Sequence, residues 1–253
     1  MNSLPVGVER EFIDDSEYPI SVPWDGILVE DPDHPADIVA RVRRVLEVLH
    51  GDDAEKVERE LVEELGVGEL REFIGSPSGF FEAHLKTYSK SRRKAPIYWP
   101  LSTASGGYTV WIYYPRLGAD TLFTVIDKYL QPKIAVVERE LAELSVDGSR
   151  SRSRQKRFDL LTRDIGELRQ FADEIKRITN LPYTPDHDDG VPICAAPLWQ
   201  LFRHSGWSSY CRDIWEKLEA GSFDWSHLAF AIWPDRVRAK AAGDRSIAIA
   251  HGI

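Results

Sequence analysis

Cysteine and long apolar runs are scarce in this chain, and each scarcity excludes a class of protein. Only Cys194 and Cys211 occur among 253 residues, so we expect no disulfide framework and predict a reducing, cytoplasmic location. No apolar run approaches the ~20 residues needed to cross a bilayer. The first residues also lack the basic-then-apolar order of a signal peptide. We therefore expect no membrane partner.

Motifs that bind a methyl donor, a nucleotide or a metal are absent from the sequence as well. Gly66-Val67-Gly68 is followed by Arg71 where a third glycine is needed, and it follows a predicted helix rather than a strand. It is typical of a helix stop. No P-loop and no His-Glu-x-x-His pair occurs. We therefore expect no catalytic, cofactor-binding or metal-binding residue in this chain.

Two weaker patterns have simpler structural interpretations. Asn180-Leu181-Pro182-Tyr183 is similar to the Asn-Pro-Pro-Tyr motif of amino-methyltransferases but lacks its middle proline and follows a helix, which favours a helix-to-loop exit. His187, Cys194, His204 and Cys211 lack the close pairing of zinc ligands, which favours buried thiols and hydrogen-bonded histidines. A Cys/His nucleophilic pair stays open, although nothing favours one.

Charge is unevenly distributed along the chain. Residues 1–70 carry 6 Lys and Arg against 19 Asp and Glu, a net charge of −13, whereas residues 71–253 carry 26 against 22. Because salt screens charges over about 8 Å at physiological ionic strength, a locally basic surface can bind nucleic acid despite the overall charge of −9. The distribution of charge is therefore more informative than its total.

Periodicity predicts an α+β chain that is predominantly α-helical. The first thirty residues are expected to be irregular, and helices are predicted at 37–50, 53–65 and 80–88. Aromatic and β-branched residues at 97–103 and 108–114 predict a β-hairpin whose first strand, carrying Pro100, lies at an edge or has a bulge.

Two heptad-like seams then predict an antiparallel, coiled-coil-like helical hairpin. They are Ile134, Val137, Leu141, Leu144, and Phe158, Leu161, Ile165, Leu168, Ala172, Ile175. A Ser/Arg-rich loop, 145–154, joins the two helices. We accordingly divide the chain into an acidic helical region (1–90), an aromatic β-hairpin (91–120), a helical-hairpin arm with a basic tip (121–180) and a Trp-rich helical region (181–253).

Two basic clusters are the candidate functional residues. The first basic cluster is Lys86, Lys90, Arg92, Arg93 and Lys94. The second basic cluster is Arg150, Arg152, Arg154, Lys156 and Arg157, at the tip and shoulder of the predicted arm. Charge runs are commonly solvated surface. A stiff hairpin, however, would present such side chains to a phosphate backbone, which they would contact without reading its sequence.

The aromatic residues of the predicted hairpin allow two interpretations. They are Tyr98, Trp99, Tyr108, Trp111, Tyr113 and Tyr114. Alternating aromatic residues on strands usually belong to the core, which is the interpretation we favour. The alternative is a platform on which unpaired bases stack.

Several longer segments resemble a known family. The segments Ser89–Thr103 (SKSRRKAPIYWPLST) and Tyr108–Leu117 (YTVWIYYPRL) resemble the region beyond the catalytic domain of BREX-type (PglX-like) adenine-specific DNA methyltransferases and related fused restriction–methylation proteins. Further segments fit this region in order: Ser78–Phe81, Asp188–Val191, Ala195–Leu198, Asp224–Ser226, Trp233–Arg236 and Asp244–His251. The resemblance covers the chain from about residue 25 onwards.

The resemblance implies a place in phage defence by N6-adenine methylation of DNA. S-adenosylmethionine would then bind a catalytic partner or another domain, since the family's donor and Asn-Pro-Pro-Tyr motifs lie upstream of the resembling region. We expect this chain, as a separate subunit, a split-gene product or a shortened form, to transfer no methyl group by itself.

The leading hypothesis is a DNA-binding accessory module that contacts double-stranded DNA through the two basic clusters. The alternative is a protein-interaction module that docks a catalytic methyltransferase or another defence protein, without contacting DNA.

Overall fold

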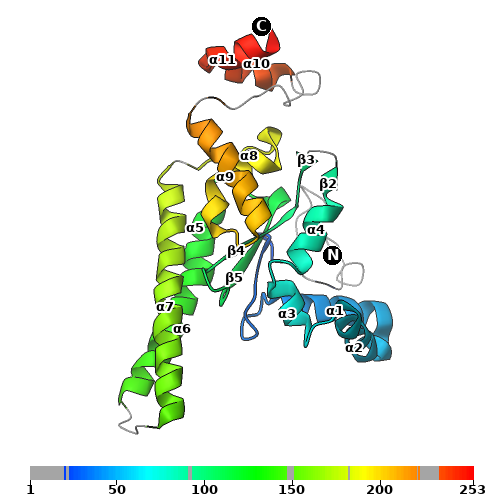
Figure 1. Ribbon diagram of the computed structural model, residues 1–253, viewed down its shortest axis with the longest axis vertical. Helices are drawn as coiled ribbons and strands as arrows, with labels where there is room; N and C mark the ends of the chain where they lie inside the picture. The colour runs from blue at the N-terminus through cyan, green and yellow to red at the C-terminus, as the bar shows by residue number, and fades with distance from the viewer. Residues whose placement is uncertain are drawn as a thin grey trace.

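A small sheet lies at the centre of the protein, with helices on both of its sides (Figure 1). The computed structural model describes residues 20, 23–90, 93–146, 151–181, 183–220, 222 and 234–253. Most of these residues are helical and the sheet is antiparallel, so the predicted α+β class is confirmed. None of the described helices is both long and apolar enough to span a bilayer.

The sheet has three strands, in the order β1-β5-β4. These are β1 (Ile27–Val29), β4 (Tyr98–Ser102) and β5 (Thr109–Tyr113). The predicted β-hairpin is confirmed as β4 and β5, and Pro100 lies on the edge strand β4, where its missing N–H is tolerated. The prediction of an irregular entry segment is wrong at β1. That strand forms because Leu28 and its two neighbours pair with β5.

Helices at the N-terminal side follow the predicted ranges closely. They are α1 (Ile38–His50), η2 (Gly51–Asp53), α2 (Ala54–Leu65), α3 (Leu70–Gly75) and α4 (Phe80–Thr87). Predictions of helix at 37–50, 53–65 and 80–88 are thus confirmed, whereas α3 was not predicted. Gly66 ends α2 with a φ of 67°, a left-handed conformation that glycine adopts without strain. The helix-stop interpretation is confirmed.

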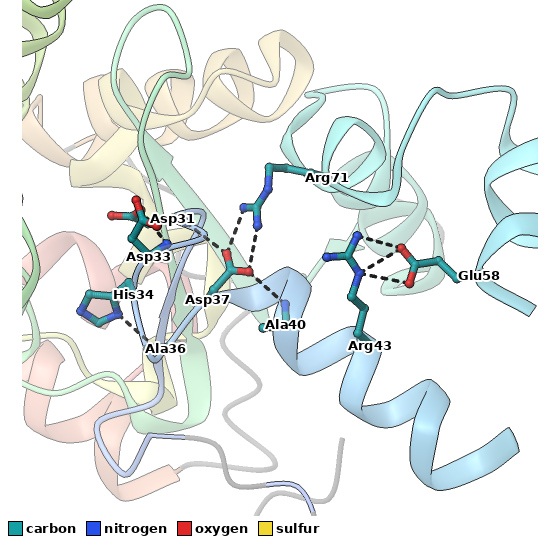
Figure 2. Close-up of polar contacts among 9 residues, drawn as sticks. All are labelled: Asp31, Asp33, His34, Ala36, Asp37, Ala40, Arg43, Glu58 and Arg71. Carbon is teal, nitrogen blue, oxygen red and sulfur yellow. Dashed lines mark hydrogen bonds and ion pairs between the residues drawn. The ribbon is translucent and has the colours of Figure 1, made fainter. Parts of the chain in front are cut away.

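Acidic side chains between β1 and α1 connect the sheet to the N-terminal helices (Figure 2). The carboxylate of Asp37 accepts hydrogen bonds from the backbone N–H of Ala40, as an N-cap, and from the N–H of Asp31. Its two oxygens also bind the Arg71 guanidinium, each at 2.9 Å. Arg43 pairs with Glu58 at 2.9 Å and joins α1 to α2. Part of the acidic N-terminal charge is therefore neutralised within the fold.

The predicted helical hairpin is present and extends away from the sheet (Figure 1). It begins with α5 (Thr121–Thr124) and the π-helical η4 (Val125–Leu130), and continues as α6 (Gln131–Val146) and α7 (Arg152–Thr179). Leu161, Ile165 and Leu168 of the α7 seam are buried, as are Ile134 and Val137 of α6. The two seams face each other because apolar residues three and four apart lie on one side of a helix. We call α6 and α7 the arm.

Shorter elements complete the chain. Between α4 and β4 lies a two-stranded hairpin, β2 (Ser89–Lys90) and β3 (Arg93–Lys94). η3 (Tyr114–Arg116) connects the sheet to the arm. After the arm come η5 (His187–Asp189), α8 (Val191–Ala195), η6 (Ala196–Leu201), α9 (Ser205–Glu219), α10 (Pro234–Gly243) and α11 (Arg245–His251). One apolar cluster runs from the sheet through the arm to α9, and Trp99, Trp111 and Trp207 are its largest fully buried side chains.

Candidate nucleic-acid interface

The first basic cluster lies at the C-terminal end of α4 and on the β2–β3 hairpin. Lys86 and Lys90 are exposed, and the Lys86 ammonium is 2.8 Å from a carboxylate oxygen of Glu82, one turn earlier on α4. Arg92 lies outside the described residues, and only the backbone of Arg93 is described, paired with Lys90 in the β2–β3 ladder. The hairpin thus brings the described members of this cluster close together.

Lys94 connects the first basic cluster to α9. Its ammonium nitrogen lies 4.9 Å from the centroid of the Tyr210 ring, a cation–π contact. Its strand partner is Ser89 on β2. Lys94 therefore has a packing role in addition to its charge.

The second basic cluster surrounds the junction of α6 and α7, and two of its members stabilise that junction. The Arg154 guanidinium donates hydrogen bonds to the carbonyl of Leu144, the Nε–O distance being 3.1 Å. Carbonyls in the last turn of a helix have no partner within the helix, so Arg154 caps α6. Arg157 pairs with Glu140 of α6 at 2.6 Å.

The other described members of the second cluster are free for outside contacts. Arg152 and Lys156 are exposed, and neither forms an ion pair with any residue in the described part of the chain. Arg150 lies outside the described residues. The structure thus separates this cluster into two arginines that stabilise the arm and two cations that point to solvent.

The two basic clusters do not form one patch. In Figure 1 the β2–β3 hairpin lies at the upper right and the arm tip at the bottom left. With 28 residues, α7 alone spans about 42 Å at ~1.5 Å per residue. Any single ligand that contacts both clusters must therefore be long. A nucleic-acid duplex meets this condition, and a small anion does not.

Burial divides the aromatic residues of the β4–β5 hairpin into two groups. Trp99, Tyr108 and Trp111 are 0–2% exposed, which confirms the core interpretation for these three. Tyr98 and Tyr113 are half-buried and face each other across the ladder with ring centroids 5.0 Å apart. Stacking with bases is thus sterically excluded for the buried rings only.

His84 of α4 holds the start of β4 in place, close to the first basic cluster. Its Nε2 accepts hydrogen bonds from the backbone N–H groups of Ile97 (3.0 Å) and Tyr98 (3.1 Å). Burial lowers the pKa of His84 to about 4, so the ring is neutral at pH 7 and Nε2 stays available as an acceptor. On the same helix, Lys86 and His204 lower the pKa of Glu82 to about 2. Hydrogen bonds from these two side chains thus hold the carboxylate beside the cluster ionised.

Structural roles explain the weaker motifs. Asn180 is the C-cap of α7, and the Tyr183 hydroxyl donates to the carbonyl of Cys194 at 2.8 Å; Pro182 lies outside the described residues. This arrangement is the expected helix-to-loop exit. The interpretation as hydrogen-bonded histidines and buried thiols fits the structure, in which His204 pairs with Glu82 and Cys211 is buried. No metal-ligand group of three occurs in the described parts of the chain.

A methyl-donor site does not fit the glycine pair at the end of α2. Gly66 and Gly68 follow a helix, and their backbone N–H groups donate hydrogen bonds to Glu63 and Glu72, so these groups are not available to a ligand. A hollow of about 200 Å³ with a mixed polar and apolar lining does lie between the β4–β5 turn and the arm. Sequence analysis missed it, because Lys133, Glu140 and Glu167 come together there only through folding.

Comparison with known proteins gives partial relationships. The adenine-specific methyltransferase PglX of Lacticaseibacillus casei (strain Zhang) is 30% identical over 121 residues, 45% of this chain and 10% of that protein. The adenine-specific methyltransferase BrxX of Escherichia coli O9:H4 (strain HS) is 22% identical over 190 residues, 67% of this chain and 15% of that protein. No family model matches.

These comparisons support the resemblance at a coarse level. The chain has partial homology to adenine-specific methyltransferases of the BREX type. It spans 10–15% of the length of the curated relatives it matches. The activity, substrates and partners of those larger proteins are therefore assigned to this chain only as proposals.

Proposed function

We propose that this chain is a non-catalytic, DNA-binding accessory part of an adenine-specific DNA methyltransferase system, acting in phage defence or restriction–modification. The observation that carries the proposal is the pair of exposed cations, Arg152 and Lys156, at the tip of a rigid arm. Partial homology to PglX and BrxX supports a place beside a methyltransferase. S-adenosylmethionine would bind that catalytic subunit or domain.

In this proposal the two basic clusters bind phosphates of one duplex at separate positions. At the β2–β3 hairpin and the end of α4, the phosphates are bound by Lys86, Lys90 and Lys94. At the arm tip they are bound by Arg152 and Lys156. Arg92, Arg93 and Arg150, whose side chains are not described, add to these contacts. Arg154 and Arg157 orient the tip by binding α6. Phosphate contacts position a protein on DNA without reading its sequence.

A titration of labelled duplex DNA at several salt concentrations tests this proposal. Neutralising about five to eight phosphates predicts a log–log slope of the association constant against salt near −4 to −7. Measuring fluorescence anisotropy between about 50 and 200 mM salt covers the range in which such a slope is visible. A binding constant that does not change with salt would contradict the proposal, as would no measurable binding at the lowest salt.

A second candidate function is docking of a protein partner through α2, and a specific observation favours it. All residues of α2 are described, and none of their side chains is buried. Leu65 of α2 is 39% exposed, and Leu49 at the end of α1 is 68% exposed. Glu55, Glu63 and Glu64 are exposed around them. An acidic, partly apolar helix face of this kind suits a basic partner.

Charge reversal tests this second candidate. The variant E55K/E63K/E64K should abolish co-purification with a co-expressed adenine-specific methyltransferase if α2 is the docking surface. Glu58 and Glu60 are left unchanged because they pair with Arg43 and Lys56. Reversal of Asp120, Asp127 and Glu143, three exposed acidic residues outside α2, is the matched control. An intact complex with the α2 variant would rule this surface out.

A further inference from the structure

Three tyrosines form a row on the surface beside the first basic cluster, and we call Tyr88, Tyr98 and Tyr113 the tyrosine row. Tyr88 is 41% exposed and contacts the His84 ring at a centroid distance of 4.6 Å. The His84 ring contacts Tyr98 at 5.7 Å, and Tyr98 contacts Tyr113 at 5.0 Å. Side chains from the C-cap of α4, from β4 and from β5 thus line up.

The tyrosine row continues to a second exposed aromatic residue through Gly26. A Cβ atom at Gly26 would lie 2.8 Å from the Cβ of Arg116 and 3.3 Å from that of Tyr113, so the two side chains flank this glycine. The Arg116 guanidinium lies over the Trp24 ring, 4.3 Å from its centroid. Trp24 is 51% exposed. An Arg–Trp stack therefore lies at the far end of the row from Tyr88.

The rings of the sheet face below α4 differ in their burial. Tyr98, Tyr113 and Trp111 lie on one face of the sheet, because their positions pair or alternate across β4 and β5. Phe80 of α4 contacts the Trp111 ring at 5.4 Å. Trp111 is thus buried, whereas Tyr98 and Tyr113 are half-buried on the same face.

Positive charge lies at the Tyr88 end of the row. Lys86 and Lys90 are exposed on either side of Tyr88, and no acidic residue occurs between Lys86 and Tyr98 in the sequence. The nearest carboxylate on α4, Glu82, is paired with Lys86 and His204. At the other end, Asp25 accepts a hydrogen bond from the Tyr129 hydroxyl and pairs with Lys128.

We propose that the tyrosine row and the Trp24–Arg116 stack bind unpaired bases of single-stranded DNA, whose phosphates are bound by Lys86, Lys90 and Lys94. The chemistry is that of single-strand binding in general, in which aromatic faces stack on bases beside cations that bind the backbone. This inference rests on the proposed function, because it specifies the state of the DNA at the first basic cluster. The arm tip would hold the neighbouring duplex.

Four labelled DNA ligands of one length test the proposal with the full chain. They are a perfect duplex, the same duplex with a central unpaired bubble, the single strand, and a single strand with abasic sites. We expect the bubble and the single strand to bind at least about fivefold more tightly than their perfect and abasic counterparts, because each stacked base strengthens binding. Equal binding of the single strand and its abasic form would overturn the proposal, since charge alone would then explain the affinity.

Point variants locate the bases on the row. Y88A and W24A should each weaken binding of the single strand by about fivefold or more and leave the perfect duplex within about twofold. Y88F, which keeps the ring, should bind like the wild type. The matched control is F123A on α5, because Phe123 is 52% exposed and lies outside the row. An equal loss in F123A, or no loss in both Y88A and W24A, would contradict the proposal.

The outcomes distinguish this inference from the proposed function. Salt-dependent duplex binding without any preference for unpaired bases would remove the base-stacking site and leave the proposed function intact. Base-dependent binding of single strands without duplex binding would support the site and remove the duplex contact at the arm tip.

Discussion

The first basic cluster lies against aromatic side chains, whereas the second lies at the junction of two helices. At the first, Lys94 contacts the Tyr210 ring and Lys86 pairs with Glu82 on its own helix. At the second, Arg154 caps α6 and Arg157 pairs with Glu140, which leaves Arg152 and Lys156 exposed. Two similar runs of Lys and Arg thus differ in how their charge is used. The comparison teaches that only part of the second cluster is available to a ligand.

The largest expected effect is at His84, which supports the first cluster and has no counterpart at the second. The variant H84A should lower the free energy of unfolding by about 2–4 kcal/mol, because two backbone N–H groups lose their acceptor and a cavity remains. Urea denaturation measures this change. H84Q, whose amide oxygen can accept, is the control and should lose less. A loss below about 0.5 kcal/mol in H84A would show that the junction does not depend on this ring.

A pH dependence of stability should follow from the same residue. The folded-state pKa of His84 is about 4 and the ordinary value is 6.5, so the unfolded state binds the extra proton between these pH values. Stability should therefore fall as the pH drops from 7 to 5, by about 1–2 kcal/mol from this group. Unfolding at both pH values measures the effect. The H84Q variant should show a smaller difference, and an unchanged difference would assign the effect to other groups.

Two neighbouring arginines of the second cluster should differ in their effect on stability. R154A should lower the free energy of unfolding by about 1–2 kcal/mol, because charged hydrogen bonds to the last carbonyls of α6 are lost. R152A should stay within about 0.5 kcal/mol of the wild type, since Arg152 is exposed. Thermal or urea unfolding of both variants checks the comparison. Equal losses would contradict the division of the cluster into structural and exposed cations.

Local periodicity predicted most of the arm and the hairpin. The seam through Leu161, Ile165 and Leu168 needs only the spacing of apolar residues, and that spacing is visible in the sequence. In contrast, β1 has three residues, and it is a strand only because Leu28 pairs with Trp111 more than eighty positions later. Such a short segment has too few residues to show a period of two, so its prediction as irregular was wrong.

The sequence predicted which basic residues belong to the candidate site, but not how the fold arranges them. The runs of Lys and Arg were visible, yet the contact of Lys94 with Tyr210 joins residues more than a hundred positions apart. The role of Arg154 depends on where α6 ends, which a helical period locates only within a few residues. Tyr88 and Trp24 were not singled out, because their place beside Tyr98 and Tyr113 arises from packing of α4 and from Gly26.

The salt dependence of duplex binding in a matched pair of double variants tests the central claim most directly. R152E/K156E reverses the two exposed cations of the arm tip, and K56E/R59E makes the same change of charge on α2, where Lys56 and Arg59 are also exposed. We predict that the first variant binds duplex DNA more weakly and has a log–log salt slope shallower by about 2, while the second keeps the wild-type slope. Identical slopes in the two variants would contradict the assignment of the arm tip as a DNA-binding surface.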